Sequence, residues 1–483
     1  MKRIILTSVL LSVSTVSFAH SDHMKPKEIQ IVEESAQNKP EQMGASSVAL
    51  LETTMELTGG DHGQGRYFSE ETTQVEKLVN QGFTMLNMFQ YTDAFRSFNT
   101  ALNLDQSSVI SQIGRAFASM SLNSEESYYL LAAKNFLVLN KDALSQKEKA
   151  WANLLLAMIV QTDVDGQPLS TATAYSNLQK ADSENLEVAV FANWVSGNYD
   201  VAALKAALEK DPINAGATHY LLHLGEMRND HDTALFYGES LAKLSLGSGH
   251  GQHMYGHALP HFNRWKEADE QFRIAHEIHW DWAKKNNVHP SEDWHYSHNL
   301  DLWSVTNMVL DPAKAVLTLE ELEQFSPRYS LDLLDLRVIT ALNVAKTDEY
   351  IKGYEDRAAN WKAYVKSSRK LYTLINQADA FETVKREILE GLNWKENPKD
   401  NTLFVAVTLI NAVRTGDTAT EGKALAYITS SLDEQFSQGG FDGWRKSVLE
   451  TLVYTRIFEV YGLEGAAKAL KDKISDVYMN PVD

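Results

Sequence analysis

Apolar and polar positions follow a helical period along most of this chain. The first residues differ, since a basic start precedes an apolar run from Ile4 to Val16, and a polar stretch with several glycines then extends to Gly65. Beyond Gly65 apolar residues recur every three or four positions, and runs with the two-residue period of a half-buried strand are almost absent. The pattern therefore predicts an all-α fold.

The apolar run near the N-terminus is typical of a cleaved secretory signal. Small residues stand at the two positions that a signal peptidase reads, and the run falls short of the roughly twenty apolar residues of a membrane-spanning helix. We expect residues 1–19 to be removed on export to the periplasm or beyond, and residues 20–65 to form a polar arm with little core. The longest later apolar run, from Trp151 to Val160, has the length of a core helix, so no membrane span is expected.

Two segments far apart in the chain share one spacing of small residues around a phenylalanine. Each has Gly, Ala, Phe and Ala at successive separations of twelve, four and three residues. The two sets are Gly82, Ala94, Phe98 and Ala101, and Gly256, Ala268, Phe272 and Ala275. Small residues at such positions let two antiparallel helices approach closely, with the phenylalanine filling the gap between them. The spacing predicts helical hairpins.

These spacings resemble the tetratricopeptide repeat (TPR), a helical hairpin of about 34 residues with small residues at fixed positions. In the register of that family, Gly256 and Ala268 fall at two of the small positions, and stepping back by one repeat places Ala234 at another. The units in register begin at Ala181, Ala215 and Gly249, and a further copy begins near Val75. The run GHGQHMYGHALPHFNRWKEA, which begins at Gly249, also resembles a secreted bacterial branch of the family related to tetratricopeptide repeat protein 38.

The resemblance implies an α-solenoid of TPR-like helical hairpins over residues 66–325, and further helical repeats over residues 326–483 that match the family only loosely. Gln106 stands where the family has proline, and the segment 281–293 is longer than an ordinary turn between repeats. In TPR proteins the first helix of each hairpin lines a concave groove that contacts a ligand. The resemblance therefore implies a binding protein for a peptide, a protein segment or a small ligand.

Composition narrows the chemistry and the partners. The chain has no cysteine, which excludes disulfides, thiolate-bound zinc, iron–sulfur clusters and covalently attached c-type haem. Any metal must therefore be held by His, Asp or Glu. The net charge of -19, which becomes more negative when the basic signal is removed, argues against nucleic acid and anionic membranes as partners.

Histidines are concentrated in one segment, since twelve of the fifteen lie between His219 and His298. At about 100° per residue, two sets of them form stripes along single faces of two predicted helices. Imidazole is a common ligand of transition metals, and two imidazoles four residues apart on a helix can reach one ion. The candidate metal ligands are His219, His223 and Glu226 on one helix and His250, His253 and His257 on the next.

The TPR register implies that both stripes face the groove, where they are suited to hold a divalent zinc, copper or iron ion. Further candidates to line the groove are His261, His295, His298, Tyr255 and Trp294. Alternatively, the histidines bond ordinary carbonyl and carboxylate neighbours, and the nearby aromatic residues form core between repeats. The sequence HEIH, from His276 to His279, is one residue short of the zinc-protease motif and is expected at a solvated helix end.

Two hypotheses of function remain open. The first is an exported binding module whose groove takes a ligand, with a divalent metal as part of that groove. The second is a metal-dependent, hydrolase-like enzyme in which the groove histidines bind a catalytic ion and Glu226 or Asp281 acts as the base. No nucleophile elbow, phosphate loop or dinucleotide fingerprint names a reaction.

Overall fold

The computed structural model describes the central part of the chain and about half of its C-terminal part. The described ranges are residues 50–63, 66–122, 126–288, 293–311, 381–391, 402–438 and 443–473, with single positions between 314 and 321 and at Gly440. The expected signal peptide and most of the polar arm lie outside them. Within these ranges the chain forms eighteen α-helices and no β-strand, so the predicted all-α fold is confirmed.

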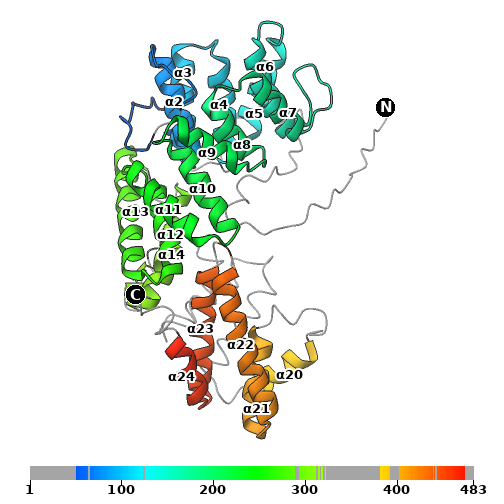
Figure 1. The fold of residues 1–483 in the computed structure, drawn as a ribbon, viewed down its shortest axis with the longest axis vertical. Coiled ribbons are helices and arrows are strands. Elements are labelled where there is room, and N and C mark those ends of the chain that lie inside the picture. Colours follow the sequence, from blue (N-terminus) through cyan, green and yellow to red (C-terminus); the bar gives the residue numbers. More distant parts are fainter. Residues whose placement is uncertain are drawn as a thin grey trace.

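Consecutive helices pack as hairpin-like pairs (Figure 1). The first group comprises α2 (Gln74–Asn87), α3 (Tyr91–Leu104), α4 (Val109–Ser119), α5 (Glu126–Leu139), α6 (Gln146–Val160), α7 (Thr171–Ala181), the π-helix η3 (Val188–Ala192), α8 (Asn193–Val195) and α9 (Val201–Lys210). The second comprises α10 (Ala215–Met227), α11 (His231–Leu244), α12 (Gly249–Ala258), the 3-10 helix η4 (Leu259–Phe262), α13 (Trp265–Asn286) and α14 (Trp294–Leu310). The C-terminal group comprises α20 (Phe381–Gly391), α21 (Thr402–Thr415), α22 (Thr418–Gln438), α23 (Gly443–Val460) and α24 (Glu464–Lys473).

Two helices of the second group begin where the repeat spacing places them. Helix α10 begins at Ala215 and α12 at Gly249. Each is capped by the residue before it, because the side chains of Asn214 and Ser248 accept hydrogen bonds from backbone N–H groups of the first turn. These caps fix where the two histidine-bearing helices start.

The predicted close approach at the small residues is also confirmed. A Cβ added at Gly82 would lie 2.5 Å from Cζ of Phe98, and one added at Gly256 would lie 3.0 Å from Cε1 of Phe272. Both phenylalanine side chains are fully buried. Each glycine therefore makes room for a ring from the next helix, which is how the hairpins close.

The connection expected over residues 281–293 is partly helical instead. The last residue of helix α13 is Asn286. Asn287 is its C-cap, and its φ of 52° is the left-handed conformation common at that position. The first part of the segment that was longer than an ordinary turn between repeats is therefore helical as far as Asn286. The apolar Trp280 and Ala283 extend the helical pattern and pack one face of this last turn inward.

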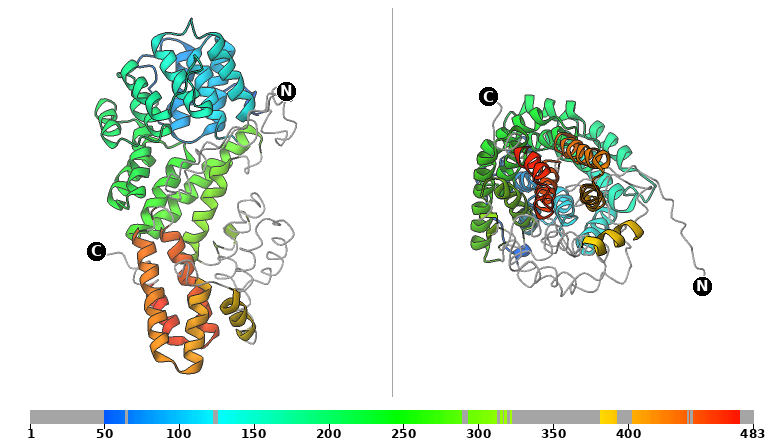
Figure 2. Two further views of the ribbon diagram at one scale, coloured as in Figure 1. Left: turned by 90° about the vertical axis from the view of Figure 1, so that its right-hand side faces the viewer. Right: turned by 90° about the horizontal axis from the view of Figure 1, so that it is seen from below.

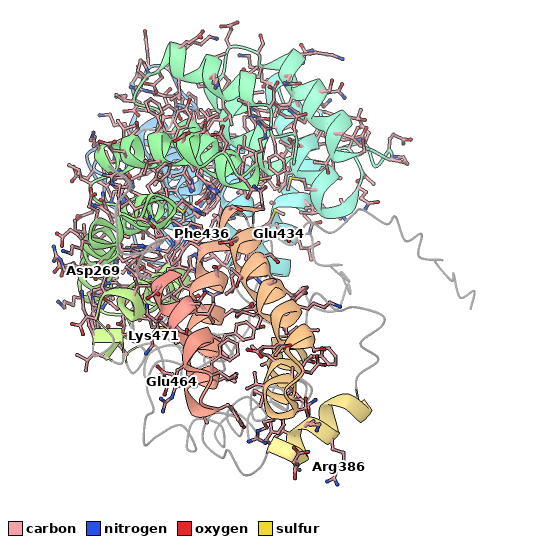
Figure 3. The ribbon with its side chains drawn as sticks, turned by 60° about the horizontal axis from the view of Figure 1, so that its bottom comes forward. Asp269, Arg386, Glu434, Phe436, Glu464 and Lys471 are labelled. Atoms are coloured by element: carbon pink, nitrogen blue, oxygen red, sulfur yellow. The ribbon has the colours of Figure 1, made fainter. Side chains whose placement is uncertain are left out.

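The C-terminal helices extend away from the second group (Figure 2). Trp444, at the start of α23, is fully buried and packs edge-on against Trp265, with ring centroids 5.5 Å apart. Arg445 pairs with Asp301 of α14 at 3.2 Å. Phe436 lies at the end of α22 that meets the second group (Figure 3), with its ring centroid 5.8 Å from that of His261. In the described part of the chain, no helix is both long enough and apolar enough to span a bilayer.

Candidate metal centre

Three helices of the second group bring seven histidines together. They come from α10, α12 and α14, and none of them is more than 6% exposed. The seven are His219 and His223, then His250, His253 and His257, and finally His295 and His298. The side chains predicted to line a groove therefore lie inside the packing of the helices, where water does not compete for their nitrogens.

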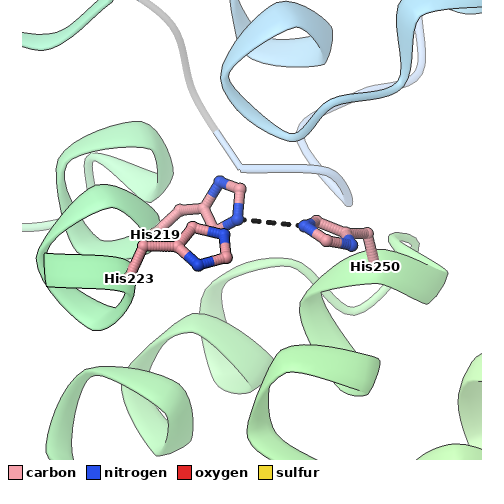
Figure 4. A group of neighbouring side chains, drawn as sticks. All are labelled: His219, His223 and His250. Atoms are coloured by element: carbon pink, nitrogen blue, oxygen red, sulfur yellow. Dashed lines mark hydrogen bonds between the residues drawn. The ribbon is translucent and has the colours of Figure 1, made fainter. Parts of the chain in front are cut away.

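The first triad consists of His219, His223 and His250 (Figure 4). One ring nitrogen from each lies within 4.8 Å of the other two, and Nε2 of His219 is 3.0 Å from Nε2 of His250. Nδ1 of His219 lies 2.6 Å from the backbone oxygen of Asn87. Because a carbonyl only accepts, this Nδ1 carries the proton and Nε2 presents its lone pair to the triad.

The second triad consists of His253, His257 and His298, whose ligand nitrogens also lie within 4.8 Å of one another. Nδ1 of His253 lies 3.0 Å from Oδ1 of Asn299, whose amide nitrogen donates to the backbone oxygen of Phe272. That second bond fixes the amide, so Nδ1 of His253 is the donor. Its Nε2 is buried and has no hydrogen-bond partner among the described residues.

The spacing of these nitrogens is close to that of a metal site. An ion bound at roughly 2.0–2.1 Å from each imidazole holds pairs of nitrogens about 3–3.5 Å apart. The contact between His219 and His250 already has this separation. Nitrogens as far apart as 4.8 Å need about 1.3–1.8 Å of closure, which rotations of the rings can supply.

Glu226 joins the two triads. Its carboxylate is 2% exposed, with Oε2 3.1 Å from Nδ1 of His223 and Oε1 3.0 Å from Nδ1 of His257. A carboxylate behind a histidine fixes the tautomer and raises the basicity of the ring as a ligand. Glu226, predicted as a further ligand, is placed to hold one histidine of each triad from behind.

Burial also sets the protonation state of the histidines. Desolvation lowers the pKa of His219 to about 3, and burial together with the neighbouring His257 lowers the pKa of His253 well below its ordinary value. Both imidazoles are therefore neutral at neutral pH. That is the state in which imidazole binds a metal.

Beside the first triad, His279 and His295 are paired through Asp293, and this pairing was not predicted. Asp293 places Oδ2 2.7 Å from Nδ1 of His279 and Oδ1 3.2 Å from Nδ1 of His295. Burial alone raises the pKa of Asp293, but the two histidines lower it below its ordinary value. His279 is 4% exposed, so the expectation of a solvated helix end is wrong there, whereas His276 bonds Glu321 at 2.7 Å. The nearness of Asp293 to His295 in sequence is the signal that was available.

The other predicted residues lie outside the triads. Tyr255 is in the core and its hydroxyl accepts from Arg264, while His261 stacks on His231 with ring centroids 3.7 Å apart. Trp294 packs against His295, with centroids 3.9 Å apart. Asp281, considered as a base, is 80% exposed and pairs with Lys284, so it is not beside the buried histidines.

A cavity of about 190 Å³ lies next to the first triad. Its lining includes Phe89, His279, Asp293, Trp294 and His295. The Phe89 ring also packs against all three rings of the triad, with centroid distances of 4.7, 5.8 and 5.4 Å. Its φ of 56° is a conformation that a bulky residue rarely adopts. The strained residue therefore separates the cavity from the triad.

Comparison with known protein families and with curated protein sequences found no match to this chain.

Proposed function

We propose that this protein binds transition-metal ions in a paired centre formed by the first and second triads. The observation that carries the proposal is the arrangement of six buried histidines as two sets of three, each set with its nitrogens directed at one region. Three imidazoles leave a fourth position of a tetrahedral ion open. The paired centre thus has the ligands for two ions and an open site on each.

The free-energy cost of burying imidazole rings favours metal binding over a purely structural role for these histidines. Burying a polar ring without a partner costs about 1–3 kcal/mol, and helices pack well with apolar side chains at such positions. Nε2 of His253 is one such buried nitrogen without a hydrogen-bond partner in the described part of the chain. A bound ion would satisfy it, and its neutral state leaves the lone pair available.

We place the paired centre in an exported, TPR-like protein. Support comes from the signal-like residues 1–19 and from helices α10 and α12, which begin one repeat length apart with their histidines in matching positions. A groove ligand remains a proposal as well, be it a peptide, a protein segment or a small molecule. N-terminal sequencing of the protein from a periplasmic extract tests export, and an intact N-terminus would contradict it.

A metal-dependent enzyme is the second candidate. The open position on each ion favours it, because catalytic sites keep such a position for water or substrate. The cavity beside Phe89 and His295 provides a space of about 190 Å³ near the centre. Turnover of a substrate that stops on metal removal, and returns on metal addition, distinguishes this candidate from metal storage.

Elemental analysis of untagged protein, purified without chelator, tests the proposal. We expect about two transition-metal ions per chain, one for each triad. His223→Ala removes a ligand of the first triad and His257→Ala one of the second, so each variant loses about one ion and the double variant loses both. His261→Ala is the matched control, because His261 is a half-buried histidine outside both triads. Unchanged metal content in the double variant contradicts the assignment.

A further inference from the structure

We propose that the paired centre holds two copper ions and binds dioxygen between them. This inference rests on the proposed metal function and adds the identity of the ion and of the small ligand. It follows from the ligand chemistry of the triads, from the charges beside them and from the size of the space that leads to them.

The ligands favour copper. Each triad offers three imidazoles, and two carboxylates of the described residues face Nδ1 atoms of histidines: Glu226 lies behind His223 and His257, and Asp293 lies between His279 and His295. Among divalent ions of the first transition row, copper binds nitrogen sites most tightly. Three imidazoles around an ion also suit both of its common oxidation states, so electron transfer requires little movement of the ligands.

Charge near the triads favours the monovalent state when no further ligand is bound. Among the described side chains beside the triads, the carboxylates of Glu226 and Asp293 can offset the charge of two monovalent ions. Glu226 lies behind the triads, and Asp293 lies behind His295, whose ring centroid is 4.4 Å from that of His250. Two divalent ions leave an excess of positive charge in a buried site, which is costly. Asp301 adds no free negative charge, because it pairs with Arg445.

The two triads are neighbours. His250 of the first and His253 of the second have ring centroids 6.0 Å apart, and one carboxylate contacts a histidine of each. Each ion in such a pair keeps one open position. Dioxygen bound at both positions takes one electron from each monovalent copper, which gives two divalent coppers and a bound peroxide, with no proton gained or lost. The reverse transfer of two electrons releases dioxygen.

Access to the centre favours a very small ligand. The cavity of about 190 Å³ is lined in part by Phe89, whose ring packs against all three histidines of the first triad. A diatomic molecule passes such a ring during ordinary side-chain motion, whereas a larger organic molecule requires the ring to leave its place. The paired centre is therefore open to dioxygen and closed to bulky substrates.

Oxygen uptake by the copper-loaded full chain tests the inference. The protein is loaded anaerobically with monovalent copper, and dioxygen is then admitted while uptake, near-ultraviolet absorption and electron paramagnetic resonance are recorded. We expect about one dioxygen for each pair of copper ions, new charge-transfer absorption, and no resonance signal because the two divalent ions couple. Purging with argon should reverse the absorption.

Variants separate this inference from the proposed function. His298→Ala removes a ligand of the second triad, so one copper ion should remain. That ion should give a resonance signal when oxidised, and the variant should take up no dioxygen between two coppers. His261→Ala should behave as the unaltered protein. Two copper ions bound without uptake, or a chain that binds zinc and not copper, overturns the inference and leaves the metal function intact. Failure to bind zinc, copper or iron overturns both.

Discussion

Replacing Glu226 by glutamine should weaken the binding of one of the two ions and leave the binding of the other unchanged. The carboxylate faces both triads, because Oε2 accepts from Nδ1 of His223 at 3.1 Å and Oε1 lies 3.0 Å from Nδ1 of His257. A glutamine amide has one oxygen and one NH₂ group, so it accepts from one of these Nδ1 atoms and cannot accept from the other. Glu226→Ala, which removes both acceptors, should weaken both ions.

The size of the effect follows from the role of the carboxylate. Loss of a partner behind a metal-bound histidine typically lowers metal affinity about 10–100-fold, or roughly 1.4–2.7 kcal/mol per ion. Because the glutamine has nearly the same shape, the fold should remain, and the apo-protein should unfold at a temperature close to that of the unaltered chain.

Competition with a chelator, followed to equilibrium, measures the two affinities. The unaltered chain should show two tight sites, Glu226→Gln one tight and one weakened site, and Glu226→Ala two weakened sites. Glu267→Gln is the matched control, since that carboxylate pairs with Arg264 at the surface, away from the triads. Two unchanged sites in Glu226→Gln would refute the reasoning.

Four further predictions concern stability and access. The pKa of His219 is about 3 in the folded chain and about 6.5 in the unfolded chain, so the unfolded state binds the proton first as pH falls. Lowering the pH from 7.5 to 5.5 should therefore reduce the free energy of unfolding of the apo-protein by about 1.4 kcal/mol through this group alone, as measured by urea unfolding. Free metal at about 100 times its dissociation constant should add roughly 2.7 kcal/mol per site, so a chelator should lower the thermal midpoint, and an unchanged midpoint would count against a folded-state site. Gly82→Ala, which meets Phe98, should cost about 1–3 kcal/mol in urea unfolding, whereas Gly465→Ala, with open space around it, should be neutral or stabilising. Phe89→Gly removes a bulky residue from a left-handed conformation and joins the cavity to the first triad. Azide should therefore bind the copper-loaded variant faster than the copper-loaded unaltered chain, as followed by stopped-flow absorption. Equal rates would show that Phe89 does not limit access to the copper.

The helices were predictable because their signals are local. The recurring spacing of small residues and phenylalanines indicates which helices pack together. Asn214 and Ser248 cap α10 and α12 at the expected positions. Histidines four apart, such as His219 and His223, share a helix face by geometry alone. These features depend on neighbours within one hairpin, so the sequence carries them directly.

The closed character of the site depends on contacts between distant residues. The repeat register indicated a groove, but it does not show that α14 supplies His298 to the second triad or that Trp444 covers His257, with ring centroids 6.1 Å apart. The positions after α13 could not be placed in register, because the helix runs beyond the expected turn. The sequence therefore predicts a groove position for His298 and a solvated helix end for His279.

The burial of the ligands has a consequence for how long an ion stays. All six histidines of the paired centre are at most 6% exposed, so an ion leaves only when helices separate locally. Its residence time is then set by the rate of that opening and not by affinity alone. A protein loaded while it folds should hold its ions through dilution and chelation that would strip an exposed site of equal strength, which makes the order of folding and metal supply part of its chemistry.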